Sequence, residues 1–218
     1  LRTRVIGVWS ALFNDLDAPK NFKRGASAAN TRPSDVWHQS RDRRNMLIFA
    51  RLRSKANGAR LCVGTYHMPC AFYSPPMMLI HSALAMSRFQ DCCLDDPGVL
   101  AGDFNIKPQD SSYNMITTGN IDPKHSDFPA PGPDGSPATQ WMPVLKHRMK
   151  SAYREVLGEE PNFTNYAQVG DDPPFVDTLD YIFCSEDVDV VDVMRLPHRS
   201  VTPGPLPIRS EPSDHTLI

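Results

Sequence analysis

A short apolar run that leads into Gly-Asp-Phe-Asn, residues 102–105, constrains this chain more than any other feature. The run, Gly-Val-Leu-Ala at 98–101, predicts a buried strand, and a Lys-Pro pair two residues after the motif stops it. Since side chains alternate along a strand, Asp103 and Asn105 point the same way at its C-terminal rim. The carboxylate can bind a hard cation or accept a proton, and the carboxamide can orient a phosphate or a water. A strand-end turn without chemistry is the alternative.

The composition is that of an ordinary globular chain with no overall attraction to polyanions. Its 218 residues suffice for one domain with a sizeable core, and 40% of them are hydrophobic. The net charge is −2, from 23 basic and 25 acidic residues, so any site for a polyanion must be a local patch. The odd count of five cysteines has no metal or disulfide spacing, which favours reduced thiols and an intracellular, cytoplasmic setting. We see no signal peptide or membrane-length apolar run, and expect no membrane partner.

Hydrophobic patterning predicts strands mixed with a few helices, which indicates an α/β sandwich. The predicted strands are residues 4–9, 45–52, 60–66, 98–101, 176–184 and 188–194. Helices are predicted at 76–94, with methionines that we interpret as core, and at 141–157, where Gly158 can cap the end. Residues 14–40 and 120–140 are predicted to be loops.

Three further segments carry polar side chains in a similar setting. They are Val-Gly-Thr-Tyr-His-Met-Pro at 63–69, Phe-Thr-Asn-Tyr at 163–166 followed by Leu-Asp-Tyr-Ile-Phe at 179–183, and Pro-Ser-Asp-His at 212–215. With residues 102–105, this order of motifs resembles the endonuclease/exonuclease/phosphatase superfamily, the metal-dependent phosphoesterases related to DNase I. The Phe-Thr-Asn-Tyr and Leu-Asp-Tyr-Ile-Phe pair is most similar to the deadenylase branch, which includes the carbon-catabolite-repression deadenylases, nocturnin, angel and the 2′,5′-phosphodiesterases.

The resemblance covers roughly residues 45–218 and implies a two-layered β-sandwich flanked by helices. The chain starts at Leu1 and its last residues, 216–218, look like a strand cut short. We therefore expect one partial domain over residues 1–218, incomplete at both ends. The superfamily's Asn strand and its Gln-Glu motif, whose Glu is the principal metal ligand, have no match, and we expect both upstream of Leu1. A degenerate member without catalysis is the alternative.

The resemblance also implies catalytic roles. Asp103 activates or positions the attacking water, and Asn105 orients the phosphate. His215 contacts the scissile phosphate and is oriented by Asp180, since a carboxylate that accepts from one imidazole nitrogen fixes the tautomer and favours the protonated ring. His67 fits a phosphate contact, although relatives have Asn two residues before this His and the present chain has Thr.

Metal and substrate contacts complete the expected site. A divalent cation offsets the negative charge of a phosphodiester, and Mg²⁺, with Mn²⁺ as an alternative, prefers carboxylate oxygens. Asp214 and Asp103 are the expected ligands in this chain. Asn165 and Phe163 occupy positions at which the deadenylase branch contacts base and ribose, by hydrogen bonding and stacking; a turn cap and a core residue are the alternatives.

The expected function is Mg²⁺-dependent hydrolysis of single-stranded RNA, as a 3′-exoribonuclease or poly(A) deadenylase. A phosphatase or phosphodiesterase acting on a small nucleotide or dinucleotide is the first alternative, and an inactive scaffold module is the second. A cluster of arginines is interpreted as a solvated face, with contact to a phosphate backbone as its alternative. Its members are Arg41, Arg43, Arg44, Arg51 and Arg53.

Overall fold

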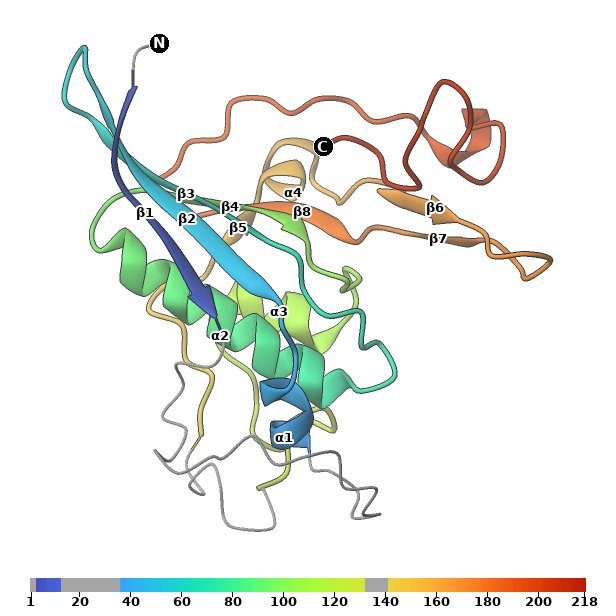
Figure 1. Ribbon diagram of the computed structural model, residues 1–218, viewed down its shortest axis with the longest axis horizontal. Coiled ribbons are helices and arrows are strands. Elements are labelled where there is room, and N and C mark those ends of the chain that lie inside the picture. The colour runs from blue at the N-terminus through green and yellow to red at the C-terminus, as the bar shows by residue number, and fades with distance from the viewer. Residues whose placement is uncertain (1–2, 13–35, 132–140) are drawn as a thin grey trace.

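The computed structural model describes residues 3–12, 36–131 and 141–218, with side chains from residue 36 onward. Its main feature is a six-stranded sheet of order β1-β2-β3-β4-β8-β5, and β6 and β7 form a separate two-stranded ribbon (Figure 1). The strands are β1 (Thr3–Leu12), β2 (Met46–Ser54), β3 (Arg60–Tyr66), β4 (Gly98–Asp103), β5 (Lys150–Ser151), β6 (Asn165–Ala167), β7 (Phe175–Asp177) and β8 (Asp180–Cys184). The helices are α1 (Val36–Arg41), α2 (Pro75–Cys93), α3 (Ser111–Thr118), α4 (Ala152–Leu157) and a 3₁₀ turn, η2 (Arg199–Val201). The predicted α/β class is confirmed.

Local sequence signals explain the first half of the sheet. β2 and β3 pair antiparallel across an Asn-Gly turn in which Gly58 has φ 75° and the amide of Ser54 donates to Ala59 O at 2.8 Å. β3 and β4 are parallel, so the chain must cross over between them, and α2 makes this connection. β8 then returns antiparallel to β4, with Asp103 opposite Asp180.

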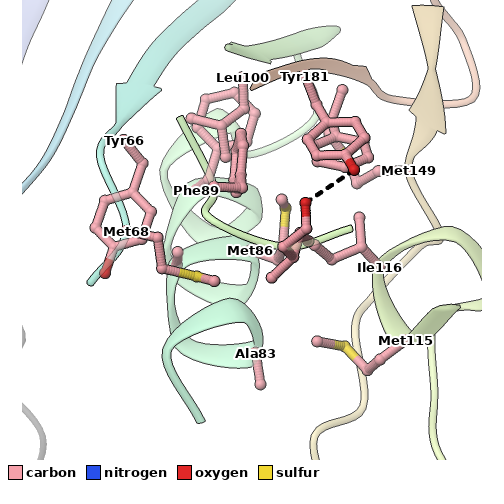
Figure 2. Packing of buried hydrophobic residues seen from close by; sticks show 14 of the residues in the cluster. Tyr66, Met68, Ala83, Met86, Phe89, Leu100, Met115, Ile116, Met149 and Tyr181 are labelled. Atoms are coloured by element: carbon pink, nitrogen blue, oxygen red, sulfur yellow. Dashed lines mark hydrogen bonds between the residues drawn. The ribbon is translucent and has the colours of Figure 1, made fainter. Parts of the chain in front are cut away.

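The core lies between the sheet and the helices α2 and α3, which pack together on one of its faces (Figure 1). Phe89 of α2 lies beside Leu100 of β4 (Figure 2). The Phe89 ring and a Leu100 methyl group pack over Gly64, where an added Cβ would come within 2.9 Å of each. Met77 and Met86 of α2 are fully buried, which confirms that the methionine-rich helix fills the core.

The opposite face of the sheet is apolar but only partly buried. In β2, Leu47 and Phe49 are buried while Ile48, between them, is 43% exposed. Half-buried aliphatic side chains continue this pattern, at Leu52 of β2 and, on the other strands, at Leu61, Val63, Val99 and Ile182. Since apolar sheet faces are stabilised by burial, this face has the composition of an inner sandwich layer.

Two predicted elements are wrong. The predicted helix over 141–157 is helical only in α4, because Gln90 holds residues 146 and 147 in a non-helical bend: its side chain accepts from the Lys146 amide and donates to His147 O. Gly158 does cap α4, with φ 81°. The predicted strand over 188–194 does not form; its backbone instead meets side chains of α4 and β5, through Tyr153 to Met194 O and Lys150 to Val188 O.

Other boundaries differ in smaller ways. The predicted strand 176–184 is broken between β7 and β8, and α3 was not predicted. The polar stretch 14–40 lies mainly outside the described residues, and its end forms α1. Among the described helices, none is both long and apolar enough to cross a membrane.

A single glycine lets the end of β4 approach the chain that leaves β3. Gly102 has φ 154°, and a Cβ there would lie 2.1 Å from the carbonyl oxygen of Tyr66. A hydrogen bond stabilises this close approach: the Met68 amide donates to Asp103 O at 2.8 Å. Gly102 therefore brings His67 next to Asp103.

We expect Gly102→Ala to lower the free energy of unfolding by at least about 2 kcal/mol, because the methyl group meets backbone atoms and φ is unfavourable. Urea denaturation of Gly170→Ala is the matched control: Gly170 has φ 54° but open space around it, so only the backbone cost of about 1 kcal/mol remains. Equal losses in the two variants would contradict the packing argument.

Candidate active site

The pairing of β4 with β8 creates the centre of the site. Asp103 and Asp180 are direct cross-strand partners at the ends of their strands. His215, from the C-terminal segment, joins them, and ligand atoms of the three side chains all lie within 4.8 Å of one another. Residues that are 112 positions apart in the chain, Asp103 and His215, thus share one rim of the sheet.

Asp180 orients His215. The Nδ1 atom of His215 lies 2.8 Å from Asp180 Oδ2, and this hydrogen bond raises the pKa of His215 above its ordinary value. The other ring nitrogen, Nε2, faces Asp103 Oδ2 at 3.9 Å. The imidazole is therefore held with one nitrogen fixed and the other directed into the centre.

Asp103 has a raised pKa, first because of burial and second because of the nearby Asp180 carboxylate. Three groups oppose this effect. The backbone amide of Asn105 donates to Asp103 Oδ1 at 2.9 Å, and the imidazoles of His215 and His67 both face Asp103 Oδ2, with His67 Nε2 at 3.4 Å. The carboxylate is thus surrounded by donors that can hold it as an anion.

Asn105 shapes the turn that follows β4. It adopts φ 50°, a left-handed conformation that asparagine tolerates better than most residues. Its side-chain amide donates to Met68 O at 2.9 Å, so it also braces the chain just after His67. The predicted catalytic residues Asp103, Asn105, His67, Asp180 and His215 are all brought together.

Asp214 is not a member of the carboxylate–histidine group. Residues 213 and 214 form a bend, and it is the neighbour His215 that joins Asp103 and Asp180. The Asp214 carboxylate instead accepts from Asn165 Nδ2 at 3.3 Å, and Asn165 forms an isolated bridge with His215. Asn165 therefore ties the C-terminal segment to β6.

Phe163 is 1% exposed and packs with Tyr166 and Leu206 in a second small core. In this position its ring offers no face to a base. The open aromatic of the ribbon is Phe175 on β7, which is 40% exposed and has the Lys107 ammonium 5.1 Å from its ring centroid. The exposure of Phe175 could not be predicted from the sequence, because the residues of β7 have the composition of any short strand.

Thr164 is a further supporting residue that the sequence did not reveal. Its buried hydroxyl oxygen accepts from the amides of Leu179 and Asp180, both at 2.9 Å. Its carbonyl accepts from the Thr216 amide at 2.7 Å. One residue therefore fixes both the start of β8, which carries Asp180, and the C-terminal segment, which carries His215. Its place beside Asn165 in Phe-Thr-Asn-Tyr was the available clue.

The donor set fits a hard divalent cation. Two carboxylates and an imidazole converge, and the rim carries oxygen ligands without a thiol, which suits Mg²⁺ or Mn²⁺ better than a softer metal. Because His215 Nδ1 is engaged by Asp180, the groups with free lone pairs toward the centre are the carboxylate oxygens of Asp103 and Asp180.

Residues 12–215 match the model of the Endonuclease/Exonuclease/phosphatase family. The chain belongs to this family. It is 31% identical over 187 residues to mouse 2′,5′-phosphodiesterase 12, covering 81% of the chain and 28% of that protein. It is 32% identical over 130 residues to the Ccr4 3′-5′-exoribonuclease subunit of the CCR4-Not complex of Neurospora crassa, covering 57% of the chain and 15% of that protein.

A solved structure is similar in fold. ANGEL2, described as a 2′,3′-cyclic phosphatase and solved with adenosine-2′,3′-vanadate, superposes with a TM-score of 0.56 at 17% identity, covering 84% of the chain and 56% of ANGEL2. The two curated relatives confirm the resemblance to the branch of deadenylases and 2′,5′-phosphodiesterases, and ANGEL2 shows the likeness in fold. The chain spans less than a third of the curated relatives and about half of this structure.

We expect Asp180→Asn to lower the pKa of His215, because the amide no longer stabilises the imidazolium. A titration of the His215 ring protons by NMR measures this shift, with Asp95→Asn, an exposed carboxylate elsewhere, as the control. An unchanged His215 pKa in Asp180→Asn would show that the pair does not set the protonation state.

Replacing Thr164 by valine keeps its shape but removes the acceptor of two buried amides. We expect a loss of about 2 kcal/mol or more in the free energy of unfolding. Thr65→Val, at an exposed β3 position, is the control in the same thermal or urea melts. Comparable stability of Thr164→Val and the native protein would refute the supporting role.

Proposed function

We propose that this chain forms the catalytic rim of a metal-dependent phosphoesterase that hydrolyses phosphodiester bonds in RNA. The observation that carries the proposal is the convergence of Asp103, Asp180 and His215 within 4.8 Å at the ends of two paired strands. Family membership supports phosphoester chemistry, and relatives named as a 3′-5′-exoribonuclease and a 2′,5′-phosphodiesterase support a nucleotide substrate.

Each side chain has a task that follows from its surroundings. Asp103, half-buried and facing two imidazoles, accepts a hydrogen bond from the attacking water and orients it in line with the phosphorus. His215, whose protonated form Asp180 favours, donates from Nε2 to a phosphate oxygen, where negative charge grows during the reaction. A bound Mg²⁺ or Mn²⁺ supplies charge neutralisation for the phosphate at the same rim.

His67 and Asn105 hold the phosphate from the β3 side. His67 is three-quarters exposed and lies beside Asp103, so it can reach a substrate oxygen without leaving its strand end. Asn105 keeps the loop after His67 in place through Met68 O. On the other side of the rim, the exposed ring of Phe175 is suited to stack on a base, and Asn165 is proposed to position the segment that carries His215.

The partly exposed sheet face supports the proposal that the chain is one part of a domain. Ile48, Leu61 and Val63 have the character of side chains that face a second sheet. We propose that further strands cover this face and add an acidic metal ligand to the rim. Hydrolysis of a small nucleotide phosphate is the second candidate, favoured by the likeness to ANGEL2, and an inactive scaffold is the third.

We expect the full-length protein to release mononucleotides from labelled oligo(A) in the presence of Mg²⁺, and Asp103→Ala to reduce kcat by about 100-fold or more. The control is Asp95→Ala, which removes an exposed carboxylate away from the site. Parallel reactions with NADP(H) and abasic DNA separate the substrate classes. Turnover of NADP(H) without RNA would favour the small-nucleotide function, and no turnover of any substrate would favour the scaffold.

A further inference from the structure

A pair of exposed aromatic side chains lies on the loop that leaves the catalytic rim. Phe72 and Tyr73 are 75% and 65% exposed, and their rings meet edge to face with centroids 5.9 Å apart. They follow His67 by only a few residues, in the segment between β3 and α2. Large aromatic rings exposed side by side are uncommon on a protein surface and mark a surface for binding.

Arginines accompany this pair. Arg43 Nη2 donates to the Tyr73 hydroxyl at 2.6 Å, and Arg44 beside it is exposed. The same segment is anchored to the rim, since Asn45 Nδ2 donates to His67 O at 2.7 Å. By contrast, Arg51, at the far end of β2, is paired with a buried carboxylate, Asp96. The arginine-rich stretch thus divides into a structural part and a part that faces solvent next to the aromatics.

The aromatic pair and Arg43 are continuous with the catalytic centre. His67 Nε2 is 3.4 Å from Asp103 Oδ2, and His67 O is held by the segment that carries Arg43. We propose that Phe72, Tyr73 and Arg43 form an extended subsite for the nucleotides of a single strand that adjoin the scissile phosphate. This inference rests on the proposed function and narrows it to a polymeric substrate.

The chemistry of the three side chains selects this ligand. Aromatic rings stack on any base, and a guanidinium contacts the phosphates between the bases, so the combination binds single strands without regard to sequence. A mononucleotide lacks the adjoining nucleotides that such a surface would bind. The chain as a whole has a net charge of −2, so Arg43 and Arg44 act as a local patch that draws the strand to one side of the site.

The test compares a long and a short substrate in the full-length protein. We expect Phe72→Ala and Tyr73→Ala each to weaken the binding of a fluorescent oligo(A) of about 15 nucleotides by about fivefold or more. Binding is measured by anisotropy without divalent metal, so it does not depend on turnover. Arg43→Ala is expected to reduce the slope of log affinity against log salt by about 0.7. In turnover, kcat/KM falls for the long oligo(A) more than for the dinucleotide ApA.

Two matched variants control for the loss of an exposed side chain. Val191→Ala removes an apolar side chain that is 92% exposed, and Arg53→Ala removes an exposed arginine at the other end of β2. Native-like affinity of Phe72→Ala and Tyr73→Ala for the long oligo(A) overturns the subsite, as does an equal fall in kcat/KM for both substrates. If the native protein cleaves neither substrate, the proposed function fails, and the anisotropy result still decides whether the surface binds a single strand.

Discussion

The site depends on the antiparallel pairing of β4 with β8, which sets two carboxylates against each other. Asp103 and Asp180 are direct cross-strand partners, and like charges in this arrangement repel. The cost is visible at Asp103, whose pKa is raised by burial and by Asp180. The neighbouring imidazoles of His215 and His67 offset this repulsion. A divalent cation bound between the two carboxylates would offset their repulsion more strongly. A pair of carboxylates that repel each other is therefore a suitable site for a metal and a phosphate.

The rest of the fold serves to keep these strand ends in register. The crossover helix α2 buries its methionines and Phe89 against the sheet and fixes β3 beside β4. Gly102 then lets the two strand ends come into contact, and Thr164 locks the β8 end to the segment that carries His215. The stability of the core and the geometry of the site are therefore supplied by the same contacts, because Asp103 and Asp180 end strands of the packed sheet and His67 and Asn105 lie just beyond such ends.

The structure brings most residues of the predicted site together, whereas part of the secondary structure predicted around them does not form. Asp103 follows a short apolar run, whereas Asp180 and His215 were placed in the site by the resemblance of their motifs to the superfamily. Asp214 was predicted as a metal ligand on resemblance, but its carboxylate accepts from Asn165 and lies outside the group of Asp103, Asp180 and His215. The helix predicted over 141–157 has a helical pattern in part, yet the long-range hydrogen bonds of Gln90 decide its path. Contacts between distant segments produce no periodic pattern in the sequence. The supporting role of Thr164 and the exposed position of Phe175 were missed for this reason.

The most direct test of the account is the ³¹P NMR line width of AMP in the presence of the full-length protein and Mn²⁺. If the carboxylates of β4 and β8 hold a cation next to the phosphate, protein-bound Mn²⁺ broadens the phosphorus resonance of AMP strongly. The account predicts that Asp103→Asn abolishes the broadening caused by protein-bound Mn²⁺, while Asp95→Asn retains it. Equal broadening by the native protein and Asp103→Asn would contradict the central claim that this rim is where metal and phosphate meet.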